Sequence, residues 1–193
     1  KLNMTMGINE ISALEAINNL SEINLKLVIK ILGDEKEASK IAKNIANHRK
    51  TRKIKNTNEL AKIIEKSKKK NYSNKINPCT KTFQALRIFV NKEITELING
   101  IINATRKLKP SGKILVISFH SIEDRIVKYF FTNFSKNKTR PSRYFPETKV
   151  IDTALFEQYK NKILRPSNQE INQNNRSRSA KLRFAIRSKT KFE

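Results

Sequence analysis

The stretch Leu108–Arg125 reads LKPSGKILVISFHSIEDR and combines three local signals. The Pro, Ser and Gly of Lys109–Gly112 are typical of a turn. The run Lys113–Ser118 is apolar almost throughout, which predicts a strand buried on both faces. Polar residues follow at once, and Ser121-x-x-Asp124 has the spacing of a capping box. The stretch therefore predicts a turn, a buried strand and a helix, with chemically active side chains where the strand ends.

The chain on either side of this stretch supplies the rest of an α/β pattern. A helical stripe runs from Thr80 to Lys107, and its length predicts a break near Asn91 or Gly100. The runs Lys162–Arg165 and Ala180–Arg187 are typical of strands, the second with Leu182, Phe184 and Ile186 alternating on one face. This order is the second half of an open α/β sheet, and we expect the first half to lie outside this sequence.

Four short helices are predicted between residues 9 and 75. Each begins at a side chain that can accept a bond from the first turn: Ser12 (with Glu15 in a capping box), Ser21, Asp34, and Thr57 or Asn58. Basic runs at Arg49–Lys55 and Lys66–Lys70 flank the last of these helices. The segment therefore predicts a compact helical unit with a cationic surface.

Charge is the dominant feature of the composition. The 193 residues include 41 Lys and Arg against 17 Asp and Glu, a net charge of +24. This balance favours a nucleic-acid partner over a merely soluble surface. No apolar run approaches the roughly 18 residues of a membrane-spanning helix. The single cysteine and two separated histidines predict a reducing, cytoplasmic setting and no zinc or other metal site.

The polar residues after the predicted strand are candidates for function. Ligands of open α/β sheets lie beyond the carboxyl ends of strands, which places Ser118, Phe119 and His120 beside a crevice. His120 can exchange a proton near neutral pH, and Arg125 can hold a phosphate. Other readings stay open: Ser121 and Asp124 can serve only as a helix cap, and Arg125 can simply pair with a neighbouring carboxylate. His48 is expected on the surface, and Cys79 as a packing residue.

Three longer segments, read together, resemble a known family. These are NPCTKTFQALRIFVNKEI (77–94), LKPSGKILVISFHSIEDRIVKYFF (108–131) and NNRSRSAKLRFAIR (174–187). They are similar to successive blocks of the bacterial small-subunit rRNA cytosine-N4 methyltransferases (RsmH, formerly MraW). LNMTMG (2–7) is similar to that family's LDMRMD-type block, with Asn3 where the family has Asp. The resemblance covers nearly the whole chain in the family's order.

The resemblance implies a partial Rossmann-like class I methyltransferase sheet with an inserted small all-helical domain. Residues 1–8 would be the remnant of the first half of the methyltransferase domain, 9–75 the inserted RNA-recognition domain, and 76–193 the second half. The implied reaction transfers a methyl group from S-adenosylmethionine to N4 of a decoding-site cytidine. The family's glycine-rich cofactor loop would precede Lys1, and the four scattered glycines form no such loop. We therefore expect no cofactor-binding residue in this chain, and no activity from it alone.

Site residues follow from the resemblance and from position. His120 and Ser118 are the catalytic candidates, because methylation of a poorly nucleophilic amine requires orientation and proton removal. The candidate contacts to the base and RNA backbone are Phe119, Arg125, Arg49, Lys50, Arg52, Lys53, Arg176, Arg178 and Arg183. The expected partners are small-subunit rRNA and the 30S subunit.

Other functions remain open at this level. The chain can be a non-catalytic RNA-binding module in which the basic helices act alone, or a degenerate fragment. A nuclease using His120, Glu123 and Asp124 is disfavoured, because the sequence lacks further clustered carboxylates for metal ions. An exposed sheet edge also predicts self-association.

Overall fold

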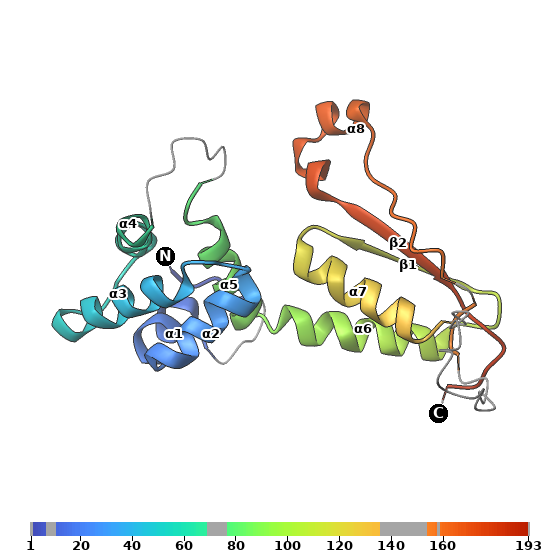
Figure 1. The fold of residues 1–193 in the computed structure, drawn as a ribbon, viewed down its shortest axis with the longest axis horizontal. Helices are drawn as coiled ribbons and strands as arrows, with labels where there is room; N and C mark the ends of the chain where they lie inside the picture. The colour runs from blue at the N-terminus through green and yellow to red at the C-terminus, as the bar shows by residue number, and fades with distance from the viewer. Residues whose placement is uncertain (1, 7–10, 69–76, 136–153, 158, 193) are drawn as a thin grey trace, which may run out of the picture. The chain divides into compact units, whose positions relative to one another are not determined.

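The computed structural model describes residues 2–6, 11–68, 77–135, 154–157 and 159–192 (Figure 1). The chain divides into two compact units, unit 1 (Lys1–Thr95) and unit 2 (Glu96–Glu193). Among the described helices, none has the length and apolar character needed to cross a membrane.

Unit 1 is built from short helices with defined starts. They are α1 (Ala13–Asn19), α2 (Glu22–Gly33), α3 (Ala38–Thr51), α4 (Thr57–Ser67) and α5 (Thr80–Val90). The predicted capping box is confirmed: Glu15 N–H donates to the Ser12 hydroxyl at 3.2 Å, and Ser12 N–H donates to the Glu15 carboxylate at 2.7 Å. Ser21 caps α2 in the same way, accepting from Asn24 N–H.

Two other predicted helix starts were wrong. Asp34 does not begin α3; it ends α2 in a left-handed conformation (φ 51°), a position at which short polar residues are tolerated. Helix α3 follows Glu37, whose side chain makes no capping bond. Helix α4 is capped by Asn56, one residue earlier than predicted, through a 3.0 Å bond from Glu59 N–H.

The core of unit 1 is closed and apolar. It contains fully buried side chains from all five helices, including Ile17, Leu25, Ile45, Ile64 and Leu86. Helix α2 approaches α5 so closely that a Cβ at Gly33 would lie 2.6 Å from the Lys81 carbonyl oxygen. Helix α5, within the segment 76–193 of the sequence analysis, therefore packs in unit 1.

The predicted break in the long helical stripe is confirmed at Asn91 and not at Gly100. Helix α5 ends at Val90, and α6 (Glu93–Lys107) begins after Lys92, which has a positive φ of 51°. Gly100 lies inside α6 with open space around it, so this glycine neither breaks nor packs the helix.

Unit 2 contains a two-stranded antiparallel sheet. Strand β1 (Lys113–Ser118) has the predicted bounds, and β2 (Lys181–Ile186) pairs with it. The other elements are α7 (Ser121–Asn133), α8 (Asn168–Gln173) and the 3₁₀ helix η1 (Asn175–Ser179). The predicted strand Lys162–Arg165 is reduced to one bridge, between Leu164 and Leu182.

The two faces of this sheet differ sharply. Helix α7 packs along one face (Figure 1), where Ile114, Ala185 and Arg183 are buried. On the opposite face, Leu115 and Ile117 are 59% and 57% exposed, and their partners are Phe184 and Leu182. We call this second surface the open face. The prediction that β1 is buried on both faces was therefore wrong for the described residues. The prediction that Leu182, Phe184 and Ile186 share one face of β2 is confirmed.

Candidate functional site at the corner after β1

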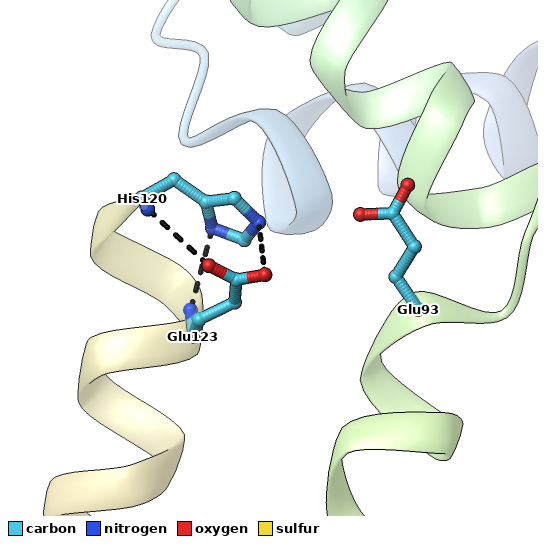
Figure 2. Close-up of side chains that lie close together, drawn as sticks. All are labelled: Glu93, His120 and Glu123. Carbon is cyan, nitrogen blue, oxygen red and sulfur yellow. Dashed lines mark hydrogen bonds and ion pairs between the residues drawn. The ribbon is translucent and has the colours of Figure 1, made fainter. Parts of the chain in front are cut away.

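The chain turns sharply between the end of β1 and the start of α7. His120 is the N-cap of α7: its Nδ1 accepts from Glu123 N–H at 3.3 Å, and the Glu123 carboxylate accepts from His120 N–H at 3.3 Å. The same carboxylate accepts from Phe119 N–H at 2.8 Å. Figure 2 shows the imidazole lying beside this carboxylate. The corner is thus held by a reciprocal cap of two titratable side chains.

The predicted cap from Ser121 to Asp124 was wrong by one residue. Ser121 is the first residue of the helix, and Asp124 bonds elsewhere. An imidazole nitrogen replaces the hydroxyl oxygen that a capping box commonly uses. The pattern was hard to recognise because His is seldom counted among capping residues.

This arrangement restricts what His120 can do with a proton. Because Nδ1 accepts a bond from Glu123 N–H, it carries the lone pair of the neutral ring, and Nε2 carries the hydrogen. Nε2 lies 3.3 Å from the second Glu123 oxygen, at an angle that makes no hydrogen bond within the described structure. A proton taken up at Nδ1 would break the cap. The geometry therefore favours His120 as the residue that orients the corner.

Glu123 is ionised in this setting. Burial raises its pKa, but the His120 imidazole at 3.3 Å and the bond from the Phe119 backbone outweigh this and hold the pKa below its ordinary value. A charged carboxylate at the first turn of α7 also interacts favourably with the helix dipole.

Asp124 lies behind the corner and joins α7 to β2. Its carboxylate accepts from Arg183 Nε at 2.6 Å and from Lys181 Nζ at 3.2 Å. Arg183 Nη1 also donates to Tyr159 Oη at 2.8 Å and to Asn161 Oδ1 at 2.7 Å. Burial raises the pKa of Asp124, but the bonds from Arg183 and Lys181 bring it below its ordinary value.

Arg183, predicted as an RNA contact, is only 3% exposed. Burial lowers its pKa, but the bonds that Arg183 donates to Asp124 and Tyr159 raise the pKa by more than burial lowers it. Its guanidinium is committed to a buried network, so the structure does not favour contact with phosphate. Sequence reasoning missed this network because its partners are 59 residues apart.

The other predicted corner residues occupy different environments. Ser118 is 2% exposed and its hydroxyl donates to the Lys181 carbonyl at 3.4 Å, which ties it to the neighbouring strand. Phe119 is 56% exposed and so remains accessible to a base. Arg125 is exposed on the outer side of α7. The corner therefore presents Phe119, with Ser118 behind it.

The basic residues of unit 1 that were predicted to contact RNA fall into two groups, one with a structural role and one exposed to solvent. Arg49 donates to the carbonyls of Ile17 (2.7 Å) and Leu20, and so completes the end of α1. Arg52 is 69% exposed and pairs with Glu59 at 3.0 Å. Lys50 and Lys53 are exposed, as are Arg176 and Arg178 in unit 2. These five exposed cations remain available to a polyanion.

His48 and Cys79, the other two residues considered in the sequence analysis, both lie in surroundings that indicate a structural role. His48 was expected on the surface but is half-buried, with its Nε2 3.1 Å from the Glu59 carboxylate. Cys79 is buried, and burial together with Glu65 raises the pKa of its thiol, which opposes a nucleophilic role.

Comparisons with known proteins agree with the resemblance seen in the sequence. A family model described as the MraW methylase family matches residues 1–188. The chain is 44% identical over 188 residues to the ribosomal RNA small subunit methyltransferase H of Ehrlichia chaffeensis, a match that covers 96% of this chain and 59% of that protein. The protein of the same name from Bartonella grahamii is 42% identical over 187 residues, which cover 97% of this chain and 56% of that protein.

A third relative of that name, from Rickettsia africae, is 43% identical over 188 residues, with 95% of this chain and 60% of the relative covered. The chain thus spans between 56 and 60% of the length of these three relatives. The match runs through both units, and the chain belongs to the MraW methylase family.

Proposed function

We propose that the chain is part of an S-adenosylmethionine-dependent enzyme that methylates N4 of a decoding-site cytidine in small-subunit rRNA. The observation that carries the proposal is family membership across both units, with relatives named as small-subunit rRNA methyltransferases. Such a substrate implies a cytoplasmic protein that meets the 30S subunit. Unit 1 would correspond largely to the inserted RNA-recognition domain, and unit 2 to the second half of a Rossmann-like domain.

The open face of the sheet supports this assignment of unit 2. Sheets of α/β proteins are covered by helices on both faces, and here Leu115, Ile117 and Leu164 remain more than half exposed. The second edge of β1 pairs with no strand among the described residues. We propose that the rest of the methyltransferase sheet, carried by polypeptide outside this sequence, pairs with this edge and covers this face.

The surroundings of the three described glycines support the proposal that S-adenosylmethionine is held elsewhere. Gly33 packs against α5, Gly100 lies within α6, and Gly112 belongs to the turn before β1. None of these opens a strand-to-helix loop that could cradle the cofactor. The cofactor, which supplies the methyl group, would therefore be bound by elements outside this sequence.

The role of this chain would be to hold RNA and orient the base. Phe119 is exposed at the corner and offers a ring on which an unstacked base can lie. Glu123 fixes the backbone of that corner through two N–H bonds. The exposed cations Lys50, Arg52, Lys53, Arg176 and Arg178 would contact phosphates and make binding salt-dependent.

The experiment supplies the part that the relatives have and this chain does not. The chain is co-produced with the part of the Ehrlichia chaffeensis relative that it does not match, and transfer of labelled methyl to 30S subunits is measured. The chain alone is expected to bind no S-adenosylmethionine and to transfer no label, whereas the pair does both, with N4-methylcytidine in the RNA digest. If the two polypeptides form a stable complex that does not bind S-adenosylmethionine, the proposal is contradicted.

The second candidate is a non-catalytic RNA-binding module. The closed core of unit 1 and its exposed basic residues favour it, because neither depends on the open face of unit 2. The same experiment separates the two: RNA binding that is unchanged by the added segment, without methyl transfer, supports the module. Size-exclusion chromatography of the chain alone would show whether the open face is covered by a second copy instead.

A further inference from the structure

A cavity in unit 1 has no part in the corner after β1. Its volume is about 730 Å³, within the range of small-molecule sites. The N-terminal segment, α4 and α5 line it, with Met4, Met6, Cys79, Phe83, Gln84 and Arg87 among the contributing side chains. Residues of two family-like blocks of the sequence, Met4 and Met6 from the first and Cys79 to Arg87 from the second, thus line one hollow.

The wall formed by the N-terminal segment is fixed in place. Leu2 is 2% exposed in the core of unit 1, and Asn3 accepts from Ala13 N–H at 2.8 Å. Asn91 clamps the following residues: its Nδ2 donates to the Met4 carbonyl at 2.9 Å, and its Oδ1 accepts from Met6 N–H at 2.7 Å. This clamp holds Met4 at a positive φ of 60°, a costly conformation that persists only when the surroundings dictate it.

The lining suits a flat ring with a polar edge. Phe83 and the two thioethers provide polarizable surfaces that pack against π-systems. Gln84 offers both a donor and an acceptor. Arg87, one turn further along α5, is oriented by a two-point bond to Glu93, with Nε at 2.8 Å and Nη2 at 3.0 Å. Cys79 contributes an uncharged thiol, since burial and Glu65 raise its pKa.

We infer that this cavity binds an unstacked nucleobase of a single RNA strand, with the ring against Phe83 and the methionines and its edge at Gln84. An anionic strand as the carrier fits the +24 charge of the chain. The inference rests on the proposed function for the identity of the RNA, and it adds a second base contact apart from Phe119.

The composition permits a selective test. The chain contains two methionines, and both line the cavity. The 193-residue chain labelled with ¹³C at the methionine methyl groups therefore gives signals from this wall alone. Cytidine 5′-monophosphate and a short oligocytidine are titrated in turn, and both signals are expected to shift, with tighter binding of the oligomer. Signals that stay unchanged up to millimolar nucleotide would overturn the inference.

Two variants and one control locate the ring. Phe83→Ala is expected to weaken binding about tenfold, as for loss of one base-stacking contact. Gln84→Leu keeps the side-chain volume but removes the polar amide, so it should also weaken binding. This second variant keeps the test valid if Phe83→Ala does not fold. Tyr129→Ala removes a 70% exposed ring of unit 2 and should leave both methionine shifts unchanged. Equal affinities in all four proteins would overturn the assignment.

Failure here differs from failure of the proposed function. One outcome is that oligocytidine changes the chemical shifts of the methionine methyl groups but the supplemented enzyme transfers no methyl group. This outcome would support the cavity as an RNA-binding site and would refute the proposed methyltransferase activity. Methyl transfer that persists in a stable Phe83→Ala enzyme with undiminished RNA affinity would refute the cavity alone. Shifts with S-adenosylmethionine and none with nucleotide would assign the hollow to the cofactor and overturn the inference.

Discussion

The two units bury different things. Unit 1 buries an aliphatic core but leaves Ile23, Leu27 and Ile31 of α2 exposed. Unit 2 buries an ion pair under α7 beside a smaller apolar cluster, and it leaves the more apolar face of its sheet open. A sheet that hides charge and exposes Leu and Ile has the reverse of the usual preference for its faces. The difference indicates that unit 1 depends mainly on its aliphatic core, whereas unit 2 depends in part on a buried ion pair.

The largest expected effect concerns the buried charge of unit 2. Asp124→Ala leaves the Arg183 guanidinium buried without its carboxylate, and we expect a loss of about 3–5 kcal/mol of unfolding free energy. Urea denaturation measures it. Arg178→Ala, an exposed arginine nearby in the chain, is the matched control and should change stability by less than about 0.5 kcal/mol. A loss below about 1 kcal/mol for Asp124→Ala would show that the pair is not effectively buried.

A matched pair of leucines compares the units directly. Leu25 of unit 1 is 0% exposed and Leu115 of unit 2 is 59% exposed. Leu25→Ala should cost about 2–5 kcal/mol. Leu115→Ala should change the stability of the chain by less than about 0.5 kcal/mol. If both cost the same in the isolated chain, the open face is covered, and self-association becomes the explanation.

Acid should affect the two units unequally through Asp124. Its pKa is lower folded than unfolded, so its contribution is complete above the unfolded value of about 3.8 and is lost as pH falls through the lower folded value. The wild type should therefore lose more stability between about pH 5 and pH 2 than Asp124→Asn does. Parallel stability curves against pH for the two proteins would rule this out.

The smallest expected effect separates capping from chemistry at His120. His120→Ala should cost about 1 kcal/mol through loss of the cap, and His120→Asn should restore most of it. In the supplemented enzyme, methyl transfer that survives in the Asn variant identifies a positioning residue. Normal stability with lost turnover in that variant would instead support the catalytic role predicted from the sequence.

Local signals were read correctly where a few neighbouring residues decide the structure. The Pro-Ser-Gly turn and the abrupt change to polar residues gave the bounds of β1, and Ser12 with Glu15 gave the start of α1. The break at Asn91 also followed from length and composition. The sequence signals for β1 and α1 each lie within a few neighbouring residues.

Features that depend on distant partners were not read correctly. Alternation in β2 correctly predicted that Leu182, Phe184 and Ile186 share one face, but it did not indicate that the opposite face is the more deeply buried one. The buried face instead carries Arg183, whose partner Asp124 lies in another element. Likewise, Arg49 was predicted to contact RNA, but its guanidinium donates to backbone carbonyl groups at the end of α1. The cavity lined by Met4 and Phe83 also has no local pattern in the sequence that would predict it.

The spacing of β1 and β2 along the chain affects how the protein is made. Ser118 pairs with Lys181, 63 residues later, so the first strand leaves the ribosome well before its partner exists. At about 5–20 residues per second, that interval lasts several seconds. During it the KILVIS run is an unpaired, aggregation-prone β-segment. The topology therefore favours early binding of chaperones to this segment of the nascent chain.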